Sequence, residues 1–241
     1  MIKKKRVFGI ILLCGGFILS SCDSFFCSKS NSEIIEKKFE TGSSSFFCLD
    51  AENTVVTLRH TNQNQILLSG TRNALSVIQT ITDNGTLTIT DRACPGTHKK
   101  VDAQTYMQNI TDIVNKRNGI ITSADEIETN SLSVENQRDG RITLESLNIQ
   151  NLTIEVQGSG NAEFAGKSKV ANISIKGSGS CNAASLSVKS AAVNISGDGS
   201  CRISVSEALN VELSGSGNVY YKGNPAISSS VTGTGRLIQL D

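Results

Sequence analysis

The clearest pattern in the chain is an alternation of apolar and polar positions that runs through its second half. In one stretch, Leu152, Ile154 and Val156 are apolar, whereas Thr153 and Glu155 between them are polar. An alternation with a period of two is typical of a β-strand that buries one of its faces. The second half of the chain is therefore predicted to consist of strands, each with one face in a core.

Pairs of glycines that flank a single residue divide these strands at regular intervals. The pairs are Gly158/Gly160, Gly177/Gly179, Gly197/Gly199, Gly215/Gly217 and Gly233/Gly235. Gly119 and Gly140 continue the series upstream, and successive units are then 18–21 residues long. A constant period of this kind indicates a repeat architecture, in which each unit forms one rung and the glycines form its corner.

Aligned on the second glycine, the repeats place apolar residues in columns. Two residues after this glycine stand Ile121, Ile142, Ala162, Cys181, Cys201, Val219 and Leu237, and four residues before it stand Val156, Ile175, Ile195, Leu213 and Val231. In the first two repeats the latter column instead holds Asn115 and Asn136. One unit cannot bury its apolar face alone, but rungs stacked at about 4.8 Å form a continuous core.

The predicted fold class is therefore all-β, a single-stranded β-helix or solenoid with rungs of about 18–21 residues and GxG corners. Glycines at the corners would permit φ > 0 and the close approach of neighbouring rungs. A propeller is the alternative repeat architecture, but its blades need about 40 residues or more.

A smaller β region is predicted before the solenoid. Strand patterns occur at Asn53–Arg59, Gln65–Ser69 and Thr86–Thr90. The segment Val101–Arg117 has a weak helical pattern, but the repeat alignment favours strand for its second half. We therefore divide this part of the chain into a β region at 38–100 and a solenoid at 101–241, which together form one domain.

The N-terminus has the pattern of a bacterial lipoprotein signal. A basic stretch, Lys3–Arg6, precedes the apolar segment Val7–Leu19, which is shorter than the roughly 20 residues needed to span a bilayer. The segment ends in Ser20-Ser21-Cys22, which looks like a lipobox. It predicts a signal peptide at 1–21, cleavage between Ser21 and Cys22, and lipidation of Cys22. The alternative is an ordinary signal peptide with a cysteine near its end.

Lipidation would place the mature protein on a membrane of the bacterial envelope, facing the periplasm or the cell surface. Residues 22–37 are then a lipidated tether, because they are mostly small and polar. Asp23 follows the lipidated cysteine and resembles a signal for retention in the inner membrane. The membrane is thus a predicted partner, contacted through the lipid.

The amino-acid composition argues against nucleic-acid binding and metal binding. The chain has 23 Lys and Arg against 22 Asp and Glu, so no basic surface predicts nucleic-acid binding. Its 7 cysteines include no CxxC motif, and its 2 histidines are His60 and His98, so no metal site is predicted. Cys181 and Cys201 share one column on consecutive rungs. They are either a candidate disulfide or two small buried apolar residues.

No catalytic set and no cofactor are predicted. The GxG pairs are not followed by a helix, as a dinucleotide-binding motif requires. Asp198 is the only aspartate between two corner glycines, so repeated calcium sites are not predicted either. Outward positions are mainly Ser, Asn, Thr, Gln and Lys, with Lys167, Lys176, Lys189 and Arg202 scattered among them. Such a surface is either only solvated or a binding face for a glycan or a protein.

The repeated corners, the lipoprotein signal and the C-terminal segments 215–225 and 233–235 resemble the putative auto-transporter adhesin, head GIN domain family. The resemblance extends over about 118–241 and is weaker over 39–100, where Leu75–Ile81 and Gly85–Ile89 resemble the family's first strands. It implies an exported β-solenoid with no catalytic residues. The leading hypothesis is a non-enzymatic adhesin or envelope scaffold. The alternatives are a carbohydrate-active β-helix enzyme and a purely structural envelope protein.

Overall fold

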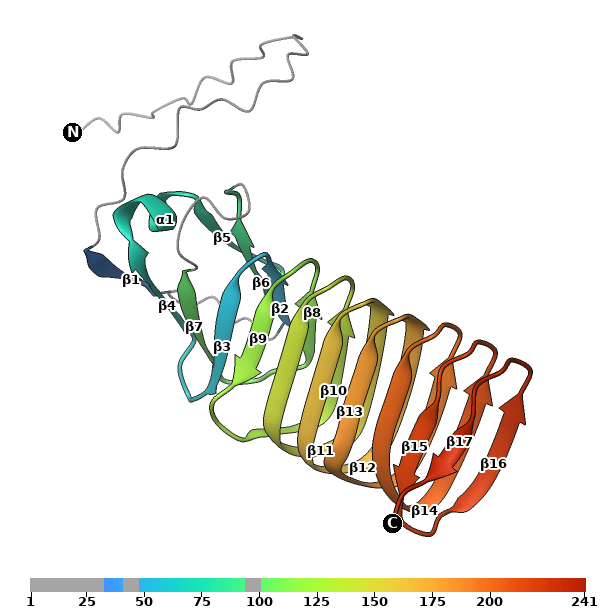
Figure 1. The fold of residues 1–241 in the computed structure, drawn as a ribbon. Coiled ribbons are helices and arrows are strands. Elements are labelled where there is room, and N and C mark those ends of the chain that lie inside the picture. Colours follow the sequence, from blue (N-terminus) through green and yellow to red (C-terminus); the bar gives the residue numbers. More distant parts are fainter. Residues whose placement is uncertain (1–32, 41–47, 94–100) are drawn as a thin grey trace, which may run out of the picture.

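The computed structural model describes residues 33–40, 48–93 and 101–241. Nearly every regular element in them is a β-strand, and the strands form one hydrogen-bonded sheet. The N-terminal strands lie at one end of an elongated solenoid, and the C-terminal strands lie at the other end (Figure 1). The predicted all-β solenoid, preceded by a smaller β region, is confirmed.

The described elements fall into two parts of the fold, a smaller β region and the solenoid. The first part contains β1 (Ile34–Glu40), β2 (Cys48–Glu52), β3 (Val55–His60), β4 (Gln65–Thr71), α1 (Arg72–Ser76), β5 (Ile78–Asp83), β6 (Thr86–Asp91) and β7 (Asp102–Met107). The second part contains β8 (Asp112–Asn115), β9 (Ile120–Ser123), β10 (Ile127–Asn136), β11 (Arg141–Gly158), β12 (Asn161–Gly177), β13 (Ser180–Ile195), β14 (Ser200–Leu213), β15 (Val219–Lys222), β16 (Ala226–Val231) and β17 (Leu237–Gln239).

Parallel pairing in register holds the rungs together. Ile154 of β11 pairs with Ile173 of β12, which pairs with Val193 of β13. The column that follows the second glycine continues without a break from Ile121 to Leu237. The alignment on the second glycine therefore gave the correct register. Since the column residues of β11 to β14 are almost fully buried, each Val, Leu or Ile among them contributes roughly 1.5–3 kcal/mol through burial.

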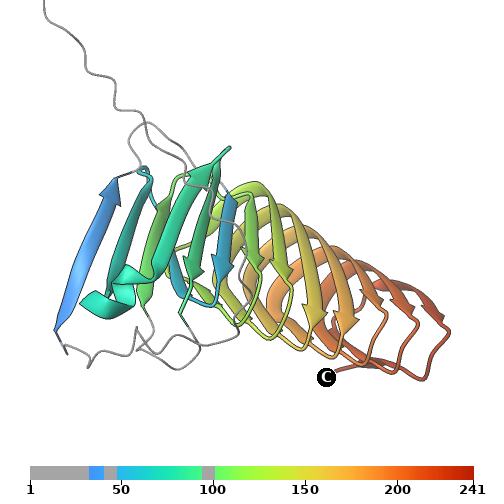
Figure 2. The same cartoon turned by 90° about the horizontal axis from the view of Figure 1, so that it is seen from above.

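Bulges divide the long strands into segments with different directions. In the pairing of β11 with β12, the register shifts between Leu144 and Leu147, and the paired residues then fall into the ranges 141–144, 147–149 and 151–158. Similar shifts occur where β12 pairs with β13 and where β13 pairs with β14. A bulge bends a strand and strengthens its twist. From β11 to β14, each rung therefore wraps around the core within what remains one strand (Figure 2).

Close contact between successive rungs explains the corner glycines. A Cβ atom on Gly179 would lie 2.4 Å from the carbonyl oxygen of Gly160, and one on Gly199 would lie 2.3 Å from that of Gly179. The predicted φ > 0 is wrong for most corners. Among the ten paired glycines, positive φ values occur at Gly158 (+93°) and at Gly177 (+159°), and the second is near extended backbone.

The two glycines of a pair differ in position, which corrects the prediction that both form the turn. The later corners bend at the first glycine and the residue after it, at 197–198, 215–216 and 233–234. The second glycines lie beyond the bend, are buried and have no positive φ; they are Gly160, Gly179, Gly199, Gly217 and Gly235.

Stacking, rather than turn formation, explains the second glycines. A Cβ on Gly217 would lie 2.0 Å from the Gly199 carbonyl oxygen, and one on Gly235 would lie 2.0 Å from that of Gly217. The Gly217 amide also donates to the Gly197 carbonyl oxygen, and the Gly235 amide donates to that of Gly215, at 3.1 Å each. A side chain at either position would push the rungs apart and break these hydrogen bonds.

The first rungs are not stacked in chain order. Strands β2 and β3 lie between β6–β7 on one side and β8–β9 on the other. Strand β1 pairs antiparallel with β4, and β4 pairs antiparallel with β7 (Figure 2). The sheet and the core thus cross the boundary that we placed between residues 100 and 101. Residues Ile34 to Lys37, which we predicted to belong to the tether, form part of strand β1.

Two local elements differ from the sequence analysis. The stretch Leu75–Ile81, which resembled a strand, begins inside the short helix α1 and becomes strand β5 at Ile78. The Thr71 hydroxyl caps α1 by accepting a hydrogen bond from the Ala74 amide at 3.3 Å. Segment 101–117 contains strands β7 and β8, so the weak helical pattern there was misleading.

Candidate functional site

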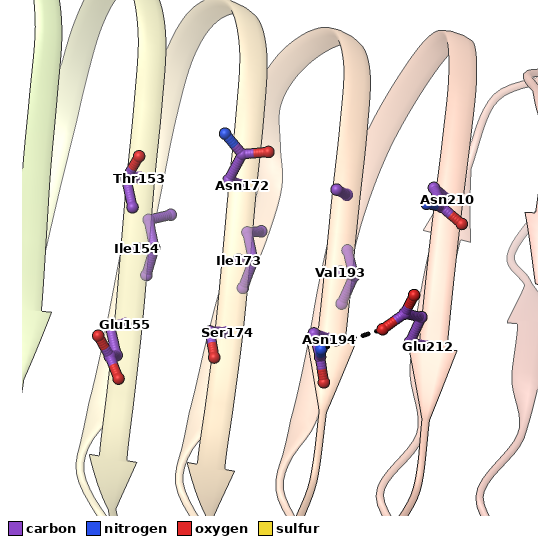
Figure 3. Close-up of a pocket in the computed structure, with 11 residues that line it drawn as sticks. Thr153, Ile154, Glu155, Asn172, Ile173, Ser174, Val193, Asn194, Asn210 and Glu212 are labelled. Atoms are coloured by element: carbon purple, nitrogen blue, oxygen red, sulfur yellow. Dashed lines mark hydrogen bonds between the residues drawn. The ribbon is translucent and has the colours of Figure 1, made fainter. Parts of the chain in front are cut away.

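A shallow hollow of about 310 Å³ crosses the outer side of β11, β12, β13 and β14. We call it the polar hollow. Two rows of outward side chains line it (Figure 3). The first row is Thr153, Asn172, Ala192 and Asn210, and the second row is Glu155, Ser174, Asn194 and Glu212. The buried Ile154, Ile173 and Val193 lie between the rows, on the core side of the strands.

The rows follow directly from strand alternation. In-register pairing places each outward side chain beside its equivalent on the next rung, about 4.8 Å away. Ala192 interrupts the first row with a short apolar side chain between Asn172 and Asn210. The result is a concave polar strip with amide, hydroxyl and carboxylate groups at regular intervals.

Hydrogen bonds fix the second row more firmly than the first. The Asn194 amide donates to Glu212 Oε2 at 3.2 Å (Figure 3). The Gln157 amide donates to Glu155 Oε1 at 3.0 Å, and Lys176 Nζ donates to the same oxygen at 2.5 Å. This hydrogen bond to Glu155 raises the pKa of the Lys176 ammonium. The Asn172 and Asn210 side chains are exposed and have no protein partner among the described residues, so their amide groups are available to a ligand.

A pair of carboxylates on neighbouring rungs lies beside the polar hollow. Glu135 and Glu155 are in register, and the Gln157 amide donates to both, at 2.9 Å and 3.0 Å. Glu155 is also paired with Lys176. Both carboxylates therefore have fixed partners on an open surface. Glu155 and Glu212 are separated by three rungs, roughly 14 Å at the spacing of a sheet, which exceeds the roughly 5–9.5 Å between the carboxyl groups of glycosidases.

The structure brings the two solenoid cysteines together. Cys181 pairs in register with Cys201, both side chains are buried, and both are free thiols in this structure. A hydrogen bond between the two side chains, together with burial, raises the pKa of the Cys181 thiol well above its usual value. Cys48 is half-buried and donates to Asp112 Oδ2 at 3.2 Å, and burial followed by this hydrogen bond raises its pKa.

The remaining predicted residues contribute no reactive cluster. His60 bonds through its two ring nitrogens to the carbonyl oxygens of Glu126 and Gln108, at 3.0 Å each. Arg202 lies 5.2 Å from the centre of the Tyr220 ring. Within the described ranges, no group of three or more His, Cys, Asp and Glu side chains could hold a metal ion. No helix in the same ranges is long and apolar enough to cross a membrane.

The residues of the predicted lipoprotein signal lie outside the described part of the chain. They are Ser21, Cys22 and Asp23, together with the apolar segment Val7–Leu19. Cys27, Cys94 and His98 lie outside it as well. The predictions of cleavage, lipidation and sorting therefore stay predictions.

A comparison with known protein families gives a match over most of the chain. The family model described as putative auto-transporter adhesin, head GIN domain, matches residues 50–225. The chain belongs to this family. The match includes β3 and runs to the residues between β15 and β16, so the first rungs are part of the family domain. The family resemblance noted in the sequence is confirmed. No curated protein matches the chain.

Solved structures share the fold at low sequence identity. A putative adhesin from Bacteroides fragilis NCTC 9343 is 22% identical, with a TM-score of 0.82 over 88% of this chain and 99% of the other. A putative lipid binding protein from Parabacteroides distasonis ATCC 8503 is 17% identical, with a TM-score of 0.70 over 88% and 98%. A putative adhesin from Parabacteroides merdae ATCC 43184 is 18% identical, with a TM-score of 0.68 over 88% and 98%. At these identities the likeness shows the fold alone.

Proposed function

We propose that the protein is a non-enzymatic, lipid-anchored adhesin of the bacterial envelope, and that the polar hollow is its contact surface for a glycan. The family membership supports an adhesin-like role. The lipobox at Cys22 supports the anchor. The observation that carries the proposal is the polar hollow itself, in which the Asn172 and Asn210 amides project from the sheet and have no hydrogen-bond partner within the described ranges.

A neutral glycan suits this surface better than an apolar ligand. Asparagine amides offer both donors and acceptors, and carboxylates accept hydrogen bonds from sugar hydroxyls. The Glu155 and Glu212 side chains disfavour an acidic ligand at the same place. The hollow is open, so a ligand there keeps much of its contact with water. We therefore expect weak binding per site that becomes strong only when several anchored copies act together.

The test compares variants of the full chain, purified in detergent, on an array of neutral and acidic glycans. Asn172→Ala combined with Asn210→Ala removes the two unpartnered amides from the polar hollow. The matched control, Asn161→Ala with Asn182→Ala, removes two amides from other positions on the rungs. We expect the first double variant to lose neutral-glycan binding and the control to retain it. Equal binding by all three proteins would contradict the proposal.

The anchor is tested separately. Cys22→Ala removes the sulfur that would carry lipid, so the variant should stay uncleaved or leave the membrane fraction. Intact mass and membrane fractionation measure the two outcomes. An unchanged mass and an unchanged distribution would refute lipidation. If Asp23 retains the protein in the inner membrane, a density gradient will place the wild type there, and recovery wholly in the outer membrane would refute that sorting role.

The in-register Glu135 and Glu155 pair is the feature that favours the alternative of a carbohydrate-active enzyme. Their partners argue against it, because Gln157 donates to both carboxylates and Lys176 holds Glu155. A general acid must place its proton on the leaving oxygen of the substrate. Glu155 instead accepts hydrogen bonds from Gln157 and Lys176 on one of its carboxylate oxygens. We expect no glycan cleavage. Turnover by the wild type that is abolished in Glu155→Gln would establish the enzyme instead.

A further inference from the structure

A second hollow, of about 520 Å³, lies over the middle segments of the rungs. Its lining comes from residues 148–150, 167–169, 187–189 and 204–206, together with Gly223 and Asn224. We call it the lysine hollow, because Lys167, Lys169 and Lys189 line it. It has no residue in common with the polar hollow.

Two glycines outside the GxG corners shape this region. Gly166 and Gly223 have φ values of +122° and +102°, in the left-handed region that disfavours side chains. A Cβ on Gly166 would lie 2.3 Å from the Leu147 carbonyl oxygen, and one on Gly223 would lie 2.1 Å from that of Val205. The chain therefore bends closely against the preceding rung at these points. Lys167 directly follows the bend at Gly166.

Strand pairing gathers the three lysines on two adjacent rungs. Lys167 and Lys169 lie on β12, on either side of the inward-facing Ser168. Ser168 pairs with Val188, and Val170 pairs with Ser190, so Lys169 and Lys189 are neighbours across the sheet. Lys167, Lys169 and Lys189 are all exposed.

The lysine charges are only partly balanced by carboxylates. Lys189 Nζ lies 3.2 Å from Glu207 Oε1, and both side chains are exposed. Lys167 and Lys169 form no ion pair with any carboxylate in the described ranges. Among the described residues that line the hollow, none is acidic. The hollow therefore carries a local excess of positively charged side chains, although the whole chain has a formal net charge of only +1.

Neutral polar groups surround the lysines. Ser187 and Ser204 follow Lys167 along the stack, in register, and Asn148 precedes it. Gln150, Ser168, Ser206 and Asn224 also line the hollow. The three cations therefore lie among hydroxyl and amide groups on rungs spaced at about 4.8 Å, a step close to the length of one sugar in an extended chain.

We propose that the lysine hollow binds an acidic polysaccharide, whose carboxylates contact the lysines and whose hydroxyls contact the neighbouring serines and amides. Binding at this site goes beyond the proposed neutral-glycan contact and involves different side chains. A concave site with lysines on its walls fits a polymer lying across the rungs. An anionic membrane surface instead requires basic side chains that project from a flat or convex face.

The experiment measures binding of the full chain, in detergent, to polygalacturonate and to alginate. The test variant carries Lys167→Gln, Lys169→Gln and Lys189→Gln. The matched control carries Lys37→Gln, Lys38→Gln and Arg72→Gln, which change the net charge equally at exposed positions outside both hollows. Fully methyl-esterified polygalacturonate provides the same sugar chain without charge, and phosphatidylglycerol vesicles provide charge without sugar.

We expect the test variant to bind both acidic polymers roughly tenfold more weakly than the wild type. The control variant should bind within a factor of about two, and binding should weaken with added salt. The test variant should keep any neutral-glycan binding of the polar hollow, so the two proposals fail separately. No binding of either polymer, equal loss in both variants, equal binding of the methyl ester, or preferential binding of the vesicles would each overturn the proposal.

Discussion

Replacing Ile195 with aspartate tests the stacking of the solenoid at its centre. Ile195 is fully buried and lies between Ile175 on one neighbouring rung and Leu213 on the other. Ser196, the next residue, is exposed on the outer surface. Ile195→Asp places a carboxyl group in the core, whereas Ser196→Asp places the same group in water beside the rung that carries Lys176.

The expected difference follows from the burial of Ile195. Loss of its apolar burial costs about 1.5–3 kcal/mol, and a buried carboxyl without a hydrogen-bond partner costs about 1–3 kcal/mol more. The sum of roughly 2.5–6 kcal/mol is a large part of the roughly 5–15 kcal/mol by which most domains are stable. It corresponds to a fall in Tm of roughly 5–24 °C for a chain of this size. Ser196→Asp should change stability by less than about 0.5 kcal/mol.

Urea unfolding followed by circular dichroism in the β region measures both variants, with the wild type as reference. Burial raises the pKa of the introduced carboxyl, so its proton is bound more tightly in the folded state than in the unfolded state. The deficit of Ile195→Asp should therefore shrink below the unfolded pKa and grow as pH rises through the folded pKa. Equal stabilities, or a less stable Ser196→Asp, would mean that the side chains face the opposite way from the structure.

Three further changes address other parts of the fold. Gly199→Ala should destabilise the protein by about 1–3 kcal/mol, because the added Cβ would lie 2.3 Å from a carbonyl oxygen of the preceding corner. The control Asp198→Ala, in the same corner, should destabilise the protein far less in the same urea assay. Asn136→Asp should lower the free energy of unfolding by roughly 2–4 kcal/mol. The buried Asn136 amide donates to the Gly140 carbonyl oxygen at 2.8 Å, and a carboxylate cannot donate that hydrogen bond. Unfolding at an unchanged urea concentration would contradict this role of Asn136. Cys181 and Cys201 should resist alkylation in the folded protein, because both are buried and the raised pKa of Cys181 keeps it as a thiol. Both should react after unfolding without a reductant, and failure to react then would show a disulfide between them.

The register of the later rungs could be predicted because two independent signals coincide. Alternation of apolar and polar residues fixes which face is buried, and the GxG corners fix where each rung begins. Together they align Cys181 with Cys201 and Ile195 with Leu213, as observed. A one-residue slip would place every apolar side chain of a rung in water, so the core itself selects this register.

The structural role of each glycine in a pair could not be predicted from the spacing. Both glycines of Gly215/Gly217 recur at the same period, so the pattern alone does not separate the bend from the packing contact. In the structure the bend lies at 215–216, so Gly215 forms the turn and Gly217 does not, whereas both glycines pack closely against the preceding corner. Gly233 and Gly235 differ in the same way, because the bend there lies at 233–234.

The first rungs could not be predicted in the same way as the later ones, because their strands are not consecutive in the chain. Strand β3 pairs with β7 and with β9, which are separated from it by residues 61–101 and 61–119. No local spacing encodes contacts of this range. Helix α1 has only 5 residues, which is too short for a helical period of about 3.6 residues to show in the sequence.

Asn115 and Asn136 appeared as exceptions in an apolar column, but the structure gives them a definite role. Both are buried, and their amides donate to the carbonyl oxygens of Gly119 at 2.9 Å and Gly140 at 2.8 Å. Both occur in the repeats whose corners have one glycine in place of a GxG pair. The asparagine amide thus holds a corner that is otherwise less regular. The sequence contained a signal for this role, because an asparagine occupies the apolar column only in the repeats that lack the first glycine of the pair.

The position of a charged residue within its rung determines the side of the solenoid on which it lies. Lys167, Lys176 and Lys189 look scattered along the sequence, yet Lys167 and Lys189 face the lysine hollow whereas Lys176 binds Glu155 beside the polar hollow. The offset of each residue from its corner glycine sets its side of the solenoid, because every rung follows nearly the same path. A chain with almost no net charge can therefore present a surface rich in carboxylates and amides on one side and a basic surface on another. If both proposals hold, a neutral glycan and an acidic polysaccharide bind at separate places on the same sheet, through side chains that share no position.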